Sequence, residues 1–237
     1  MFQSNKEYFE FLKQSGVHSF LQETPNNHLT DKHIQTKSTE NKDLKSLNEI
    51  TEISDLIPLI SNLKSDLQKT AKNLVLFDGD TNSKLMIVGE APGQEEDEQG
   101  VPFVGSVGQL LNKMLSAIQL DRKDIYVTNA LPWRLPQNRT ATDQEILEFL
   151  PFLQRQIEII KPKCIYVLGT TAAKAILSTP LSLDELRGKW HSYKSINMDR
   201  SIQVLVSYHP SFLLQSPKYK KEAWGDVQML QKKLNEN

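Results

Sequence analysis

The chain has 237 residues, of which 38% are hydrophobic, and its formal net charge is -1. This length suffices for one sizeable domain with a hydrophobic core, and the near-zero charge disfavours a protein that binds nucleic acid by charge alone. The single cysteine, Cys164, excludes an internal disulfide and a metal cluster held by several cysteines of one chain. The sequence contains no apolar run of the roughly 18 residues that span a membrane and no apolar stretch typical of a signal peptide, so we expect a cytoplasmic protein.

The first 46 residues differ in composition from the rest of the chain. Apolar side chains at helical spacing predict a short helix over residues 4–14, and residues 22–46 form a polar stretch that is typical of a linker. The apolar residues between Leu47 and Lys72 predict a helix that is interrupted at Pro58. We therefore divide the chain into an N-terminal helix and polar linker, residues 1–46, and one folded domain, residues 47–237.

Apolar strands alternate with helical stretches from residue 85 onward. The predicted strands are residues 85–88, 125–127, 164–168 and 204–206, and the predicted helices are residues 108–118, 142–160 and 171–177. Such alternation is typical of a parallel sheet that is covered by helices on both faces. We predict an α/β fold, a three-layer αβα sandwich with a four-stranded parallel sheet, whose functional site lies at the carboxyl ends of the strands.

Polar or glycine-rich residues follow each predicted strand. The first strand leads into GEAPG (89–93) and the acidic run EEDE (95–98), which we interpret as an acidic glycine-rich loop. The other strands lead into NALPWRLPQNR (129–139), GTT (169–171) and SYHPS (207–211). The first loop lacks both GxxxxGK[ST] and GxGxxG, and its carboxylates would repel phosphate, which argues against a phosphate-binding loop.

The side chains at these strand ends permit a small set of reactions. None of them is a hydroxyl or thiol with an activating partner, so nucleophilic acyl transfer is disfavoured. Carboxylates with one histidine allow metal-dependent hydrolysis, although they supply few ligands. Alternatively, an asparagine reads the edge of a pyrimidine while an aromatic ring stacks on its face. A histidine then stabilises the leaving base, and a carboxylate stabilises the cationic sugar or orients a water.

Four motifs also carry a resemblance to a known family. GEAPGQEEDEQGVPFVG, VTNALPWRLPQNR, LRGKW (186–190) and HPSFLL (209–214) are similar to family 4 uracil-DNA glycosylases and stand in the same order, between about residues 63 and 230. The resemblance implies an αβα sandwich with a four-stranded parallel sheet, in agreement with the pattern above. It also implies hydrolysis of the N-glycosidic bond of uracil flipped out of DNA, which leaves an abasic site for base excision repair. The expected partner is uracil-containing DNA, the expected state is a monomer, and the expected location is the cytoplasm, at the nucleoid.

The resemblance further implies a role for individual residues. The catalytic set, which would position water, stabilise the sugar cation and face the uracil oxygen that gains charge, is Glu90, Glu96, Asp97 and His209. The set that would hold the base or the pocket mouth is Gly89, Phe103, Asn129, Asn138 and Arg139. The set that would contact DNA is Arg134, Arg187, Lys189, Ser211 and Lys218, with residues 212–214 as a wedge into the duplex.

The chain departs from the family where a cofactor is concerned. Family 4 glycosylases typically hold a 4Fe-4S cluster with four cysteines, and the resemblance places these at or near Asn62, Ser65, Trp133 and Phe149. None of the four is a cysteine here, and Cys164 falls in a predicted strand. We therefore expect no cofactor and no metal, and we expect the rings of Trp133 and Phe149 to fill the space.

Two other functions remain open. A non-catalytic DNA-binding or polymerase-associated module could keep this fold, although such a module has no use for carboxylates that face DNA. A relative that traps the abasic product covalently would need a histidine in an inserted basic loop, and the sequence has no histidine between His33 and His191. Taken singly, several candidate residues also have structural explanations: Phe103 as core, Asn129 as a turn former and Lys218 as a helix end.

Overall fold

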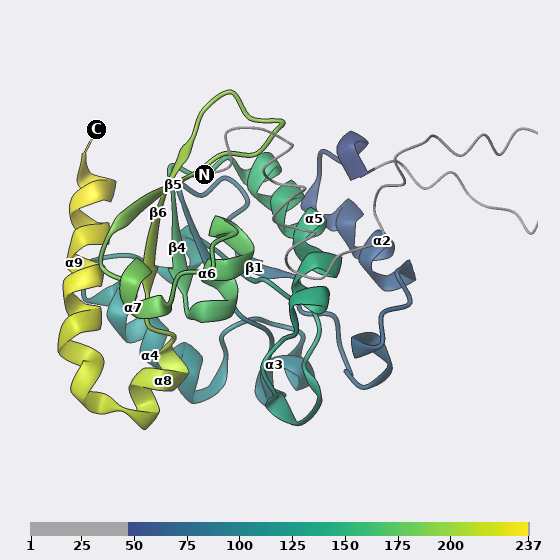
Figure 1. Ribbon diagram of the computed structural model, residues 1–237, viewed down its shortest axis with the longest axis horizontal. Coiled ribbons are helices and arrows are strands. Elements are labelled where there is room, and N and C mark those ends of the chain that lie inside the picture. Colours follow the sequence, from purple (N-terminus) through teal and green to yellow (C-terminus); the bar gives the residue numbers. More distant parts are fainter. Residues whose placement is uncertain (1–46, 237) are drawn as a thin grey trace, which may run out of the picture. The chain divides into compact units, whose positions relative to one another are not determined.

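A computed structural model describes residues 47–236, and its central feature is a six-stranded sheet in the order β1-β3-β2-β4-β6-β5 (Figure 1). The strands are β1 (Phe77–Gly79), β2 (Leu85–Gly89), β3 (Tyr126–Asn129), β4 (Cys164–Leu168), β5 (Trp190–Tyr193) and β6 (Ile202–Ser207). Strands β3, β2, β4 and β6 are parallel, whereas β1 and β5 pair antiparallel at the two edges. The predicted helix at 4–14 and the predicted linker at 22–46 lie outside the described residues.

The α/β prediction is confirmed, and the four predicted strands are the central four of the sheet. The sequence pattern does not reveal the two edge strands, so the sheet has six strands rather than four. β1 is only three residues long, and β5 has a single buried residue, Tyr193. Edge strands of this kind carry too few apolar residues to give a recognisable period. By contrast, every residue of β2 and β4 is buried, as expected of parallel strands covered on both faces.

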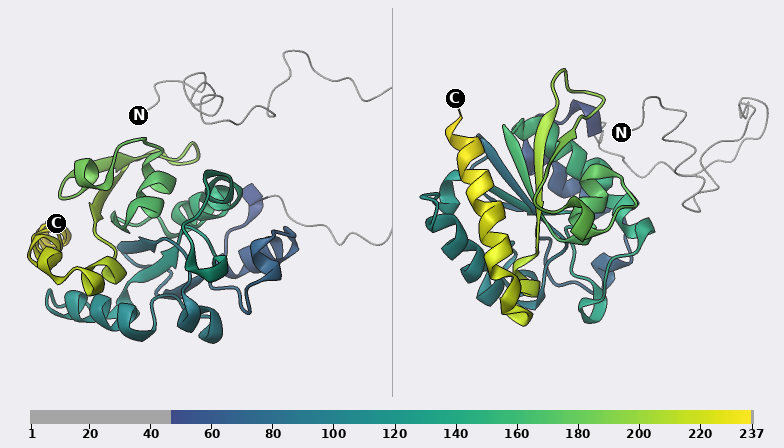
Figure 2. Two further views of the ribbon diagram at one scale, coloured as in Figure 1. Left: turned by 60° about the horizontal axis from the view of Figure 1, so that its bottom comes forward. Right: turned by 60° about the vertical axis from the view of Figure 1, so that its left-hand side comes forward.

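Helices cover both faces of the sheet. On one face lie α4 (Gly105–Ser116) and α9 (Lys220–Asn235), and on the other lie α2 (Leu56–Asn62), α5 (Asp143–Ile160) and α6 (Thr170–Leu177) (Figure 2). Neighbouring side chains of β2 alternate between the two layers: Met86 and Val88 belong to the α5 side, and Leu85 and Ile87 to the α4 side. No helix of residues 47–236 is long and apolar enough to cross a membrane.

Short helical elements complete the described part of the chain: η1 (Leu47–Glu49), η2 (Ile53–Asp55), η3 (Leu67–Lys69), α3 (Gln94–Gln99), η4 (Arg122–Asp124), η5 (Pro136–Asn138), α7 (Leu183–Leu186), α8 (Pro210–Gln215) and η6 (Pro217–Tyr219). Two expectations are corrected by them. Pro58 does not interrupt a helix but lies in the first turn of α2, where its missing N–H costs nothing. The acidic run is not a loop but helix α3, whose first turn favours carboxylates because the helix dipole is positive there.

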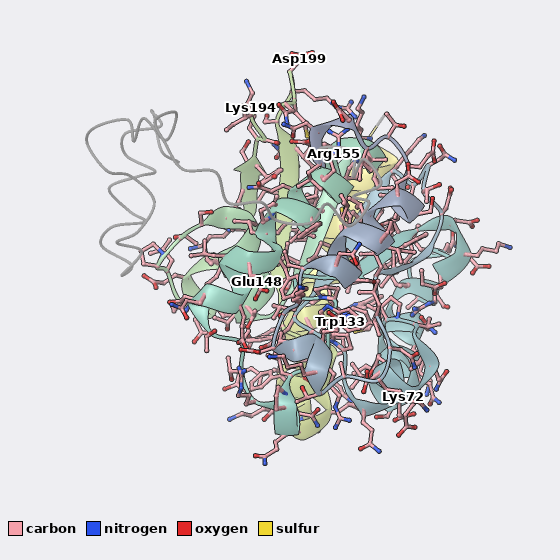
Figure 3. The ribbon with its side chains drawn as sticks, turned by 90° about the vertical axis from the view of Figure 1, so that its right-hand side faces the viewer. Lys72, Trp133, Glu148, Arg155, Lys194 and Asp199 are labelled. Carbon is pink, nitrogen blue, oxygen red and sulfur yellow. The ribbon has the colours of Figure 1, made fainter. Side chains whose placement is uncertain are left out.

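The segment of residues 47–72 is attached to α5 and to the loop after β3 by apolar contacts. Its buried residues, which include Leu56 and Ile60, belong to the same cluster as Trp133 and Phe149. Arg155 of α5 adds a polar contact, because its Nε donates to the carbonyl oxygen of Ile50 at 2.8 Å. Trp133 and Arg155 both lie on the side of the molecule that carries α2 and α5 (Figure 3).

This packing predicts a large loss of stability when the ring of Phe149 is removed. Phe149 is 1% exposed, so Phe149→Ala leaves a cavity and lowers the free energy of unfolding by about 3–5 kcal/mol. Denaturant unfolding followed by circular dichroism measures the change. The control is Gln144→Ala, an exposed position on the same helix, for which we expect a change within about 0.5 kcal/mol. Equal stability of the two variants would contradict the role of Phe149 in the core.

Candidate active site

A pocket of about 380 Å³ lies at the carboxyl ends of β2, β3 and β6. β2 is the point at which the strand order reverses, since the chain continues to β3 on one side and later to β4 on the other. Open α/β sheets bind ligands at such a point, and pockets for small ligands measure roughly 300–1,000 Å³. The candidate residues that line it are Glu90, Glu96, Phe103, Asn129, Asn138, Arg139, His209 and Ser211.

Other lining residues were not candidates from the sequence: Ala91, Pro92, Gly93, Val107, Leu135, Thr140 and Gln215. All of them except Val107 lie within a motif quoted above or directly after one, as Thr140 follows Arg139. Their position within or next to a motif is therefore the feature of the sequence that could have identified them as pocket residues. Val107 had no such signal, because it reaches the pocket from the start of α4.

Glu90 stands directly after β2, and its backbone is fixed to the loop after β3. The carbonyl oxygen of Glu90 accepts from the N–H of Leu131 at 3.0 Å. Its carboxylate is half-buried, and Oε1 makes a long contact of 3.5 Å with the N–H of Ala141. Most of the hydrogen-bonding capacity of this carboxylate is therefore left for a ligand or a water in the pocket.

The ring of Phe103 forms one wall of the pocket. It is 4% exposed, and its centroid lies 5.6 Å from that of the His209 imidazole, with the planes tilted by 34°. Gly89 permits this arrangement, because a Cβ at that position would lie 2.4 Å from Cζ of Phe103 and 2.5 Å from Oδ1 of Asn129. Gly89 is therefore required by the close approach of these two side chains.

Asn129 ends β3 with a buried side chain that faces the pocket. The residue is 5% exposed, and its amide has no hydrogen-bond partner among residues 47–236. The amide lines the pocket, so its donor and acceptor are available to a ligand or to water there. Since the amide both donates and accepts, it suits a ligand edge that presents an acceptor beside a donor.

His209 precedes α8 and is held in one tautomer. Its Nδ1 accepts from the N–H of Ser211 at 3.2 Å and lies 2.7 Å from the Ser211 hydroxyl, so the proton resides on Nε2. Burial lowers the pKa of His209 to about 4, and the ring is neutral at physiological pH. Gly169, at φ +92°, packs behind it, because a Cβ there would lie 3.2 Å from Cβ of His209. The site thus presents a neutral N–H donor.

The two remaining acidic candidates are engaged in structural hydrogen bonds. The carboxylate of Glu96 accepts from the N–H groups of Gly93 and Val104, each at 3.0 Å, and so ties the loop after β2 to the residues around Phe103. Asp97 is 4% exposed and accepts from the N–H groups of Lys72 and Asn73 at 2.8 and 3.0 Å. Asp97 does not line the pocket, so the structure separates this pair of neighbouring carboxylates.

Of the cationic candidates, Arg139 is the one that lines the pocket. Its guanidinium binds both carboxylate oxygens of Glu145, at 2.5 and 2.8 Å, and this contact lowers the pKa of Glu145 to about 2. Nε of Arg134 donates to Oδ1 of Asn138 at 3.0 Å, which connects it to the pocket through a lining residue. Both arginines therefore lie at or next to the pocket mouth.

The other cationic candidates do not line the pocket. Arg187 forms ion pairs with Asp226 at 3.0 Å and Glu222 at 2.7 Å, and its guanidinium lies 4.8 Å from the centre of the Tyr208 ring. Asp226 is 2% exposed, so Arg187 neutralises a buried charge. Lys189 donates to a backbone oxygen of α7, and Lys218 lies 5.0 Å from the centre of the Tyr219 ring.

Comparison with known proteins assigns the chain to a family. The family described as the uracil DNA glycosylase superfamily matches residues 76–228, which is more than half of the chain. The chain belongs to this superfamily. The type-4 uracil-DNA glycosylase of Pyrobaculum aerophilum is 38% identical over 176 residues, or 72% of this chain and 89% of that protein. The type-4 enzymes of Archaeoglobus fulgidus and Sulfurisphaera tokodaii are 36% and 38% identical, over 73% and 69% of this chain and 87% and 76% of theirs.

The residues of this superfamily member do not fit the iron–sulfur cluster of family 4. At the positions where the resemblance places cysteines, Asn62 is exposed, Ser65 is buried, and Trp133 and Phe149 lie in the apolar cluster. Cys164 lies in β4, where burial raises the pKa of its thiol to about 11 and keeps it protonated. Among residues 47–236, no group of three or more His, Cys, Asp and Glu side chains is arranged to hold a metal.

The lowered pKa of His209 predicts the behaviour of its ring in solution. An unfolded histidine titrates near pH 6.5, so between about pH 6.5 and 4 the unfolded chain takes up a proton that the folded protein does not. His209 therefore reduces the free energy of unfolding as the pH falls through this range. Long-range ¹H–¹⁵N NMR spectra should show Nε2–H and titration near pH 4, and His209→Asn identifies the signals. Titration near pH 6.5 would contradict the assignment.

Proposed function

We propose that this superfamily member is a uracil-DNA glycosylase, which hydrolyses the N-glycosidic bond of uracil flipped out of DNA and leaves an abasic site for base excision repair. The observation that carries the proposal is the amide of Asn129, which makes no side-chain hydrogen bond among residues 47–236 and lines one pocket with Phe103 and His209. The type-4 relatives compared above are named for the same activity.

Asn129 and Phe103 would recognise the base. Uracil presents the N3–H donor beside carbonyl acceptors, and the amide of Asn129 can accept from the first and donate to a second. The ring of Phe103 would stack on the face of the base, which contributes about 1–3 kcal/mol in comparable sites. Because both side chains are nearly inaccessible to solvent, this recognition requires that the base leave the duplex.

His209 and Glu90 would act on the reacting atoms. As the bond between C1′ and N1 breaks, its electron pair moves into the uracil ring, and the Nε2–H of His209 donates to the oxygen that gains charge. A neutral donor suits this role, since it provides a hydrogen bond without having to transfer its proton. Glu90 would stabilise the cationic sugar and orient the water that forms the new bond to C1′.

We assign supporting roles to the other two acidic candidates. Glu96 lines the pocket but has both oxygens engaged by backbone N–H groups, so we propose that it shapes the loop around Phe103. Asp97 holds residues 72 and 73, and we propose no contact with substrate for it. Of the three acidic residues expected to act in catalysis, we therefore assign a direct role in the reaction to Glu90 alone.

DNA would approach over the pocket mouth. Arg139 and Asn138 lie there. Ser211 is in the first turn of α8, and Leu214 near the end of that helix is 40% exposed and would enter the duplex as a wedge. We also propose that the enzyme acts as a monomer. We further propose that it acts in the cytoplasm on chromosomal DNA.

The first test is release of uracil from a uracil-containing oligonucleotide, followed by alkaline cleavage of the abasic product. Wild-type protein should cleave, and Glu90→Gln should reduce the single-turnover rate by about 10²–10⁴-fold with little change in DNA affinity. The matched control is Glu98→Gln, an exposed glutamate of α3 outside the pocket, which should retain the wild-type rate.

Two results would count against the proposal. Wild-type protein that binds DNA but releases no uracil would favour the non-catalytic module of the same fold. A rate for Glu90→Gln equal to that of Glu98→Gln would remove Glu90 from the chemistry, while leaving the activity itself established.

The dependence of DNA affinity on salt separates structural from DNA-binding cations. Lys218→Ala removes one exposed charge, so the slope of log K against log salt should fall by about one. Arg187→Met should leave the slope unchanged and lower the free energy of unfolding by about 3–5 kcal/mol, because Asp226 loses its cationic partner. Titrations between low and moderate salt, with denaturant unfolding alongside, measure both. If Arg187→Met also reduces the slope, Arg187 contacts DNA after all.

A further inference from the structure

We propose that Arg122 is a positioning residue for the reaction, which holds Phe103 in the orientation that stacks on the base. The inference rests on the proposed function, in which Phe103 contacts the substrate. Arg122 does not line the pocket and lies in η4, before β3, so its effect must be transmitted through the residues that it binds.

The guanidinium of Arg122 makes hydrogen bonds to three separate parts of the chain. Nη1 donates to the carbonyl oxygen of Phe103 at 2.8 Å, and Nη2 donates to the carbonyl oxygen of Pro102. Nε donates to Oδ2 of Asp78 in β1 at 2.7 Å, and Nη1 also reaches Oδ1 of Asn112 in α4 at 3.3 Å. The side chain is 18% exposed, and these contacts occupy donors on all three of its nitrogens, so a direct role in binding DNA is disfavoured.

Phe103 needs such a support because its backbone is strained. Its φ is +50°, in the left-handed region, which costs a residue other than glycine about 1–3 kcal/mol and persists only when the surroundings enforce it. Gly108 leaves room for this conformation, since a Cβ there would lie 1.8 Å from the carbonyl oxygen of Phe103. Glu96 holds the next N–H, that of Val104, so the strained residue is fixed on both sides.

The edge strand β1 orients the guanidinium. Asp78 binds Nε, which leaves the two Nη groups to reach the carbonyl oxygens of residues 102 and 103. Gly79, at φ +91°, allows β1 to lie close to η4 and to the start of β3. A Cβ at this position would lie 1.9 Å from the carbonyl oxygen of Ile125. A lysine could not replace this fork, since a single ammonium cannot reproduce the planar set of donors.

The test is a double-mutant cycle between Arg122 and Phe103, read as the single-turnover rate of uracil release. Arg122→Met should slow the wild-type background by about 10–100-fold, because small displacements of a substrate-positioning group have effects of this size. In the Phe103→Ala background the same substitution should change the rate less than threefold. Thermal unfolding of each variant measures stability separately, and Lys123→Met, an exposed neighbour, should behave as wild type in both backgrounds.

A readout that does not depend on activity accompanies the cycle. Amide hydrogen exchange at Val104 should accelerate in Arg122→Met and remain unchanged in Lys123→Met. If Arg122→Met does not fold, Arg122→Lys and Asp78→Asn take its place, and we expect smaller rate losses that also disappear in the Phe103→Ala background. A wild-type protein without uracil release would overturn the proposed function, while the exchange data would still decide the positioning role.

The positioning role is overturned by any of three results. The first is a folded Arg122→Met with wild-type rate and exchange. The second is an equal fold-loss of rate with and without the Phe103 ring, which would indicate a general structural role. The third is a loss confined to DNA affinity, which would make Arg122 a DNA contact.

Discussion

The site depends on the close approach of two side chains to a backbone without a Cβ. At Gly89 the chain leaves β2, and the ring of Phe103 and the amide of Asn129 both occupy the space that any other residue would fill. A third group, the imidazole of His209, lies against the same ring. The flat walls and the unpaired amide of the pocket therefore follow from one position at the end of one buried strand. Glu96 and Arg122 both bind the backbone on either side of the Phe103 ring.

The sequence was sufficient for the centre of the fold and for most of the pocket, for a physical reason. Parallel strands that are buried on both faces appear as continuous apolar runs, and the residues that follow them must meet at one edge of the sheet. Glu90, Asn129 and His209 were found in this way, and the structure places them around one pocket. The edge strands and the contacts of Arg122 could not be found, because β1 and β5 have few buried residues and the partners of the Arg122 side chain lie 10 to 44 residues away in the chain.

Some charged residues near a motif are bound to other parts of the protein. Asp97 and Arg187 both stand within or beside sequences typical of the family, yet Asp97 is buried and bound to the backbone at residues 72–73, and Arg187 is paired with the buried Asp226. Asp97 and Arg187 differ from Glu90 in their tertiary contacts. Their partners, the backbone at residues 72–73 and the carboxylate of Asp226, are distant in sequence and cannot be predicted from the motif. Residue type and spacing suggest where charge gathers, and the three-dimensional partners decide whether that charge is available to a substrate.

The apolar contacts of residues 47–72 have a consequence for the assembly of the protein. In family 4 the resemblance places a metal cluster between this segment, the loop after β3 and α5, whereas here Ile60, Leu67, Trp133 and Phe149 join the same parts through buried side chains. The contact between these three parts is therefore made by side chains of the protein alone. Assembly of this junction depends on the burial of apolar side chains during folding, and not on a supply of iron.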